Sequence, residues 1–268
     1  MIDLPPVPAI VFVSERDGDA EIYRMDESGE TRLTNHPARD SKPCWSRAAG
    51  FIAFVSSRNG SSDLFLMGEN GENPRPLTED TFKDGDPTFS PDGKKVLFSS
   101  TRQGKHFDLF LIDTDGQNLQ ALTNDKTSKF EPAFSPDGNK IAFIGLSADG
   151  KTDLFVLDRE KEKIENLSNS PDLNEHAPCF SPDGKRILYG AFKGGRSDLW
   201  TIGASGEGRE RLTDGPGLIG HPCWCPDGKI TFERLEKKKE IWLLDLVTLV
   251  PTLLSGEGHQ DSDPCCAR

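Results

Sequence analysis

Short apolar runs separated by turn-forming residues recur along the whole chain. Typical runs are 10–13, 52–55 and 141–144, which are rich in β-branched and aromatic residues. Runs of this composition between turns predict β-strands. No stretch shows the apolar spacing of a helix or a capping box, so the pattern predicts an all-β chain.

A second pattern recurs in register with these strands: a Pro, a small residue, an aromatic residue and a Ser. Its prolines are Pro43, Pro87, Pro132, Pro178, Pro222 and Pro264. The fifth copy has Cys in place of Ser, and the sixth is degraded. Consecutive prolines are 44, 45, 46, 44 and 42 residues apart. A nearly constant period of this length with strand-like content is typical of a β-propeller.

Each unit reads as four strands, a to d. Strand a carries the Pro motif, a Pro-Asp-Gly turn leads to the apolar strand b, and strand d ends in Leu-Thr or Leu-Ser. The chain begins at a b strand and ends on an a strand. We therefore expect the segment around 263–266 to pair with strand 10–13 and close the ring, because exposed sheet edges are a liability.

We thus predict one domain over residues 1–268, a six-bladed β-propeller of four-stranded antiparallel blades. Aromatic side chains should pack between neighbouring blades and form the core. An acid opens strand c in all six units, which indicates a structural role. Arg16, Arg58 and Arg102, at matching positions in the b–c hairpins, are its expected companions.

The chain is acidic, with a formal net charge of −12 and a pI of about 4.9. This charge disfavours nucleic acid and anionic membranes as partners, because both require a positive field. No apolar run approaches the roughly 20 residues of a membrane span. The first residues also lack the basic and apolar regions of a signal peptide. We expect a monomer.

Six cysteines are present, and four of them follow the motif proline directly: Cys44, Cys179, Cys223 and Cys265. The other two units place Thr and Ala there, so the position requires a small side chain. We expect the cysteines to be reduced core thiols, which favours a reducing compartment.

The sequence Pro-x-[Trp/Phe]-Ser-Pro-Asp-Gly with a downstream Leu-Thr resembles the PD40, or WD40-like, repeat of the TolB C-terminal propeller. The resemblance covers about residues 9 to 266. It implies a six-bladed propeller, usually of an envelope protein that binds other proteins. TolB proteins also have an N-terminal α/β domain, which this sequence lacks. We expect the cytoplasm for the chain as given, and the periplasm if it is a processed TolB-type protein.

The two faces of the predicted ring differ in their loops. The a–b and c–d turns are short and repetitive, whereas the b–c hairpins and d–a connections are longer and differ between blades, as expected of binding loops. A protein or peptide partner is therefore expected on the second face. Its predicted contacts are Phe82, Phe130, Leu218, Ile219, Asp84 and Asp86.

The last residues of the d–a connections should surround the mouth of the central channel. These residues are Asp40, Lys42, Asp84, Asp86, Glu131, Glu175, His176, His221, Asp261 and Asp263. Carboxylates suit a divalent cation such as Ca²⁺, and the two histidines extend the choice to Mn²⁺. The metal-ligand candidates are Asp86, Glu131, His176, His221 and Asp263. The alternative is a solvated acidic mouth in which loop backbone, Lys42 or Lys129 holds each acid.

The leading functional hypothesis is a non-enzymatic scaffold that binds a protein or peptide through the variable face and channel mouth. The alternative is a metal-dependent lyase or hydrolase that acts on an acidic sugar or another small ligand. In that case His176, His221, Glu131 and Asp263 would be metal ligands or acid–base groups. A structural module cut from a larger protein is the third hypothesis.

Overall fold

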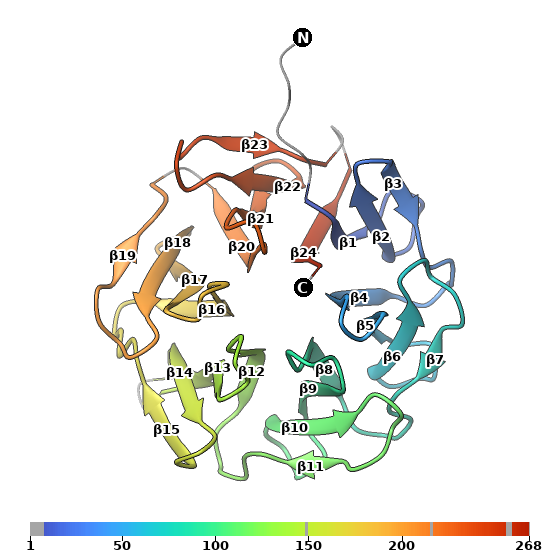
Figure 1. Cartoon of the computed structure of the whole chain (residues 1–268), viewed down its shortest axis with the longest axis horizontal. Helices are drawn as coiled ribbons and strands as arrows, with labels where there is room; N and C mark the ends of the chain where they lie inside the picture. Colours follow the sequence, from blue (N-terminus) through green and yellow to red (C-terminus); the bar gives the residue numbers. More distant parts are fainter. Residues whose placement is uncertain (1–7, 148–149, 215–216, 256–258, 268) are drawn as a thin grey trace.

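A computed structural model describes residues 8–147, 150–214, 217–255 and 259–267. These residues form twenty-four strands in six four-stranded sheets. Figure 1 shows the sheets as blades arranged around a central axis. The predicted all-β, six-bladed propeller is therefore confirmed. Within the described ranges, no helix is long and apolar enough to cross a membrane.

The blades are numbered from 1 to 6 along the chain, and each is given from its inner to its outer strand. Blade 1 contains β24 (Asp261–Cys266), β1 (Ile10–Ser14), β2 (Glu21–Asp26) and β3 (Gly29–Arg32). Blade 2 contains β4 (Asp40–Ser46), β5 (Phe51–Ser56), β6 (Asp63–Gly68) and β7 (Arg75–Pro76). Blade 3 contains β8 (Asp84–Phe89), β9 (Lys95–Ser100), β10 (Asp108–Asp113) and β11 (Gln120–Ala121).

Blades 4 to 6 follow the same order. Blade 4 contains β12 (Lys129–Phe134), β13 (Lys140–Leu146), β14 (Thr152–Asp158) and β15 (Lys163–Asn166). Blade 5 contains β16 (Asn174–Phe180), β17 (Arg186–Lys193), β18 (Arg196–Gly203) and β19 (Glu210–Arg211). Blade 6 contains β20 (Leu218–Trp224), β21 (Ile230–Leu235), β22 (Lys239–Leu244) and β23 (Pro251–Leu253).

The ring closes in blade 1, where the C-terminal strand β24 pairs antiparallel with β1 (Figure 1). In this pairing Ser14 lies opposite Asp261. The predicted closure is confirmed. A disulfide between Cys225, just after β20, and Cys266 in β24 also joins blade 6 to blade 1. The prediction that all six cysteines are reduced is therefore wrong for this pair, because ring closure brings their Cα atoms to 5.2 Å.

The core lies between the blades. Six clusters of buried apolar side chains each join two neighbouring blades. Between blades 1 and 2, for example, Val11 and Ile22 of one blade pack with Ile52 and Phe54 of the next. Burial at each blade interface makes the ring rigid, and the loops are held on this frame.

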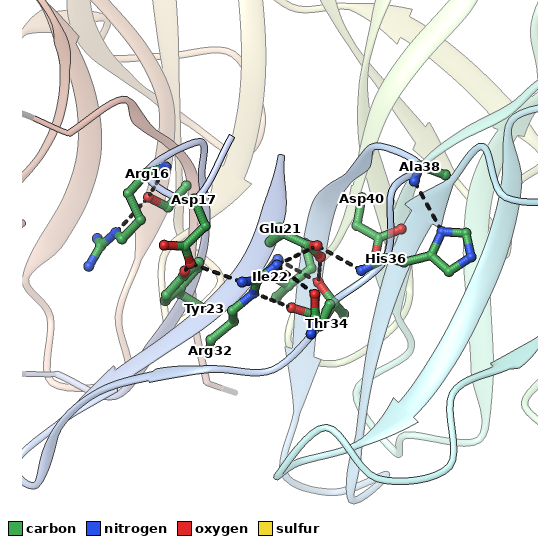
Figure 2. Close-up of polar contacts among 12 residues, drawn as sticks. Arg16, Asp17, Glu21, Ile22, Tyr23, Arg32, Thr34, His36, Ala38 and Asp40 are labelled. Carbon is green, nitrogen blue, oxygen red and sulfur yellow. Dashed lines mark hydrogen bonds and ion pairs between the residues drawn. The ribbon is translucent and has the colours of Figure 1, made fainter. Parts of the chain in front are cut away.

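A repeated hydrogen bond, which we call the Leu-Thr clasp, connects the end of strand d to strand c within each blade. In blade 1, the Thr34 hydroxyl accepts a hydrogen bond from the Ile22 backbone N–H at 2.9 Å and donates one to the Glu21 carboxylate (Figure 2). The other blades repeat the bond to the strand c backbone, using Thr78, Thr123, Ser168, Thr213 and Ser255. The Leu-Thr motif and the acid opening strand c therefore support the fold.

Candidate binding site at the mouth of the central channel

Every inner strand has a β-bulge at the residue before its proline. In β4, residues 42 and 43 together lie opposite a single residue of β5. The residue before the proline has a φ between 44° and 53° in all six blades, which is uncommon for residues other than glycine. Bulges re-aim side chains, and these six line a cavity of about 150 Å³ in the channel. We call them the mouth residues: Lys42, Asp86, Glu131, Ala177, His221 and Asp263.

Lys42 extends its ammonium group among the other mouth residues. Its Nζ lies 3.0 Å from His221 Nε2, 3.4 Å from Asp86 Oδ1 and 3.8 Å from Glu131 Oε1. Burial alone would lower the pKa of Lys42, but the charges of Asp86, Asp263 and Glu131 outweigh it and raise that pKa. Lys42 is therefore a fixed positive charge inside the acidic mouth.

Hydrogen bonds connect the mouth from blade to blade. The backbone N–H of Glu131 donates to Asp86 at 3.2 Å, and that of Ala177 donates to Glu131 at 2.6 Å. The backbone N–H of Lys42 donates to Asp263 at 3.4 Å. Backbone and Lys42 thus hold these acids, as the alternative interpretation of the sequence proposed. Lys129, in contrast, is buried outside the mouth cavity and pairs with Asp125 at 2.6 Å.

His221 forms the opposite side of the mouth together with Asp263 and Glu233. Its Nδ1 lies 3.2 Å from Asp263 Oδ1 and 3.3 Å from Glu233 Oε2. Burial alone would lower the pKa of His221, but Asp263 and Glu233 together raise it. The sequence analysis missed Glu233 on β21. Other units have Val, Ser, Ile or Gly at this position of strand b. The unusual charged residue at this position was therefore the sequence signal that could have identified Glu233.

Four acids predicted at the mouth are buried behind it instead. Asp40, Asp84, Glu175 and Asp261 are at most 2% exposed and do not line the mouth cavity. Each of them forms an ion pair with an arginine. The pairs are Arg58–Asp40 at 2.7 Å, Arg102–Asp84 at 2.7 Å, Arg209–Glu175 at 2.9 Å and Arg16–Asp261 at 3.1 Å. The three hairpin arginines therefore pair with strand a of their own blade, not with the acid opening strand c.

A larger depression lies beside the mouth, between blades 4 and 5. We call it the side pocket; its volume is about 560 Å³. Three mouth residues border it, and Phe130, Ile144 and Phe192 supply apolar walls. Thr152, Asn174, Glu175 and His176 complete its lining. The mixture of apolar walls and a few polar groups is typical of ligand pockets.

His176 has a buried ring nitrogen, Nδ1, without a hydrogen-bond partner among the described residues. Its Nε2 lies 3.4 Å from Ser197 Oγ, whose own hydrogen is donated to the Ile219 carbonyl. Nε2 therefore carries the ring proton. Burial lowers the pKa of His176, so the imidazole is neutral and Nδ1 is an acceptor without a partner among the described residues. A Cβ on Gly190 would lie 2.1 Å from the ring, so any other residue at this position would displace the His176 ring.

The predicted apolar contacts differ in accessibility. Phe82 and Leu218 are exposed, whereas Phe130 is half-buried with its ring 5.1 Å from that of Phe107. Ile219 is buried in the core between blades 5 and 6, so it is not an accessible contact. Phe192, which is 38% exposed at the rim of the side pocket, was missed. Other units have Glu, Ser, Thr or Leu at the equivalent position, so an aromatic residue that departs from this pattern was the available signal.

The predicted metal ligands do not converge on one point. Among the described residues, His221, Glu233 and Asp263 have ligand atoms within 4.8 Å of one another. Asp86 and Glu131 instead contact Lys42, and His176 lines the side pocket. Both ring nitrogens of His221 lie in contacts with charged groups. As arranged, this donor set fits a network of ion pairs better than it fits a divalent cation, which requires a neutral imidazole.

The fold and the mouth define a β-propeller with a candidate site at one end of its channel. The family model of the TolB beta propeller domain matches residues 103–240. That of the dipeptidyl peptidase IV N-terminal region matches residues 9–144. Each covers just over half of the chain. The chain therefore belongs to the TolB beta propeller domain family, and it also matches the dipeptidyl peptidase IV N-terminal region.

Solved structures with the same fold include two TolB proteins. TolB from Acinetobacter baumannii has a TM-score of 0.82 and 20% identity; the alignment covers 97% of this chain and 66% of that one. A putative TolB from Agrobacterium tumefaciens has a TM-score of 0.76 and 19% identity, covering 94% and 90%. An oligogalacturonate lyase in complex with manganese has a TM-score of 0.62 and 14% identity, covering 95% and 74%. At these low identities, the TM-scores show a common fold and nothing further. A sequence comparison with curated proteins finds no match.

Proposed function

We propose that this propeller is a non-enzymatic scaffold that binds a peptide segment of a protein partner. The peptide lies on the face of the b–c hairpins and d–a connections, with one side chain in the side pocket. The observation that carries this proposal is the side pocket itself. It combines exposed and half-buried aromatic walls with polar groups next to a mouth that presents five different residue types in six blades.

The residues of the pocket define the chemistry of the peptide. Phe130 and Phe192 provide rings against which an apolar or aromatic side chain packs. Thr152 and Asn174 offer polar groups to the peptide, and Glu131 attracts a positive charge. The net charge of −12 adds long-range attraction for a basic peptide. The preferred ligand is thus a basic peptide with an aromatic or aliphatic anchor.

A random-peptide display library, selected against the immobilised protein, tests this proposal. Selected peptides should combine a basic residue with an apolar anchor. Replacing an aromatic anchor of the pocket, by Phe192→Ser or Phe130→Ser, should weaken binding by about 2 kcal/mol, or roughly 30-fold. Matched controls are Leu119→Ser and Ile164→Ser, which remove exposed apolar side chains outside the pocket.

Retention of peptide affinity in both pocket variants would contradict the assignment of the side pocket. Equal losses in the two control variants would do so too, since they would show that binding does not depend on this site. Failure to select any peptide above background would refute peptide binding at this face.

The second candidate, a metal-dependent lyase or hydrolase for an acidic sugar, is favoured by one observation. His221, Glu233 and Asp263 lie close enough together to share an ion. Manganese would first have to displace the proton of His221 and move Lys42 away from Nε2. Metal analysis of the purified protein, with melting curves in added Mn²⁺ and Ca²⁺, decides this point. Absence of bound metal and an unchanged Tm would remove the motive for this candidate.

A further inference from the structure

Three carboxylates meet between blades 2 and 3, outside the channel. Asp63 opens β6, Asp80 lies in the connection from β7 to β8, and Asp84 opens β8. One oxygen of each carboxylate lies within 4.8 Å of one oxygen of each of the others. None of the three residues lines the mouth cavity or the side pocket. We call them the interblade acids, and they are separate from the site described above.

The negative charge of the interblade acids exceeds the positive charge beside them. Arg102 Nη2 lies 2.7 Å from Asp84 Oδ2 and 3.2 Å from Asp80 Oδ2. Three ionised carboxylates beside this one guanidinium leave two negative charges without a counter-charge. Burial raises the pKa of Asp84 although Arg102 lies beside it, so the guanidinium does not fully offset the cost of burying this carboxylate.

Asp63 has a buried oxygen without a partner. The residue is 0% exposed. Its Oδ2 lies 2.9 Å from Ser61 Oγ, which is also 2.7 Å from the Asp80 carbonyl oxygen, so the carboxylate faces the connection that carries Asp80. Its Oδ1 has no hydrogen-bond partner among the described residues. In blades 1, 3 and 5, by contrast, a threonine hydroxyl donates to the corresponding acid. A buried carboxylate oxygen without a partner is costly and calls for a ligand.

The next blade interface shows what lies at the equivalent place between blades 3 and 4. The positions of Asp63, Asp80 and Asp84 are there taken by Asp108, Asp125 and Lys129. Asp80 and Asp125 each accept a hydrogen bond at 2.8 Å from the backbone N–H two residues further on, so the two connections share this turn. Lys129 Nζ lies 2.6 Å from Asp125 and 3.5 Å from Asp108. An ammonium group therefore joins the two acids of that interface.

We propose that Asp63, Asp80 and Asp84 bind one Ca²⁺ ion, which takes the place that the Lys129 ammonium has at the next interface. Ca²⁺ accepts carboxylate and carbonyl oxygens in irregular arrangements, whereas Mg²⁺ keeps several waters and is rarely enclosed by protein ligands alone. Asp63 and Asp84 are at most 2% exposed, which favours the ion that sheds its water more readily. Softer metals prefer His or Cys, and this donor set contains neither.

The ion would join two blades and the connection between them. Asp80 accepts a hydrogen bond from the backbone N–H of Phe82, which is exposed on the face of the d–a connections. Bound Ca²⁺ would therefore fix the segment that presents Phe82. The inference is independent of peptide binding, because the interblade acids lie outside the side pocket and the ion is measured directly.

The test is a calorimetric Ca²⁺ titration of the full chain after treatment with EDTA and dialysis, together with melting curves. The wild type should bind one Ca²⁺ per chain at the interblade acids with a Kd below about 1 mM. Its Tm should rise as Ca²⁺ is added, since the ion binds the folded chain. A parallel titration of Glu233→Gln distinguishes this site from the acids of the mouth.

A matched pair of substitutions locates the ion. Asp63→Asn keeps the shape of the side chain but removes its charge, and it should weaken Ca²⁺ binding at least about 10-fold. Asp108→Asn is the same change at the next interface, where Lys129 supplies the cation, and it should bind Ca²⁺ as the wild type does.

A double variant transfers the arrangement of the next interface. Lys129 and Ser147 stand at the positions of Asp84 and Arg102. Asp84→Lys combined with Arg102→Ser should therefore abolish both the binding of Ca²⁺ and the rise in Tm, because the new ammonium replaces the ion. Circular dichroism checks the folding of every variant, and the double variant decides the point if Asp63→Asn fails to fold.

Several results would overturn the proposal. They are the absence of a saturable equivalent of Ca²⁺ in the wild type, unchanged affinity in Asp63→Asn, and an equal loss in Asp108→Asn. Loss of the ion in Glu233→Gln with full binding in Asp63→Asn would place it at the mouth instead. Mg²⁺ held as tightly as Ca²⁺ would overturn the choice of ion.

Discussion

The disulfide that joins blade 6 to blade 1 should stabilise the closed ring by a calculable amount. Cys225 and Cys266 are separated by 41 positions in the sequence. Cross-linking a loop of this length removes conformational entropy from the unfolded chain worth about 4 kcal/mol at 25 °C in the chain-entropy model. The clean perturbation is Cys225→Ser, because Ser46, Ser90 and Ser135 occupy the same motif position in other blades.

Denaturant unfolding of the oxidised wild type and of Cys225→Ser measures this contribution. The variant should lose about 4 kcal/mol of unfolding free energy. Reduction of the wild type should lower its stability to that of the variant, while reduction of the variant should change nothing further. A non-reducing digest should yield the peptides of Cys225 and Cys266 cross-linked. Equal midpoints for oxidised wild type and variant, or a digest without the cross-link, would refute the reasoning.

Three further perturbations test the closure, the buried ion pairs and the mouth. Deleting residues 259–268 removes β24 and should abolish cooperative unfolding in calorimetry; a compact product with an unchanged transition would contradict ring closure. Arg58→Met leaves the fully buried Asp40 without its guanidinium partner and should cost about 3–5 kcal/mol in urea unfolding, and a loss under about 1 kcal/mol would count against the pairing. Burial alone would raise the pKa of Glu233, but His221 and Lys239 together lower it to about 2. Because the unfolded pKa is higher, Glu233→Gln should cost about 3 kcal/mol near pH about 6, a difference that should shrink below pH about 4.5 in unfolding curves; a difference independent of pH would contradict it.

The strand pattern and its period were sufficient to predict the blades and the closure. Each blade repeats the same apolar strand, turn chemistry and Leu-Thr clasp, so local and global signals agree. The disulfide was missed for the opposite reason. Cys225 and Cys266 occupy positions that hold Ser and an aromatic residue elsewhere, and only the curvature of the closed ring brings them together.

The candidate site was only partly predictable, because a bulge interrupts strand alternation. In a regular strand, Asp40 and Lys42 would share one face. The bulge adds one residue to β4 at Lys42 relative to its partner strand β5, and this interrupts the alternation of side chains. As a result Lys42 lines the mouth, whereas Asp40 turns back to Arg58. The left-handed conformation of the residue before the proline could not be predicted from the residue type, because Lys, Asp, Glu, Ala and His all adopt it here.

The same bulge explains how a repetitive fold acquires a distinctive site. A left-handed conformation is normally costly for a residue with a side chain, yet all six blades impose it at the residue before the proline. The backbone of the mouth is therefore set by the repeat, and the side chain at each position can vary without altering the fold. Blade 5 has Ala177 there, which leaves a gap in the ring of charged mouth residues. Ala177 follows His176 in the sequence, and His176 lines the side pocket together with Phe192, so the blade whose mouth residue is uncharged is also a blade that supplies an apolar wall and a polar ring to that pocket.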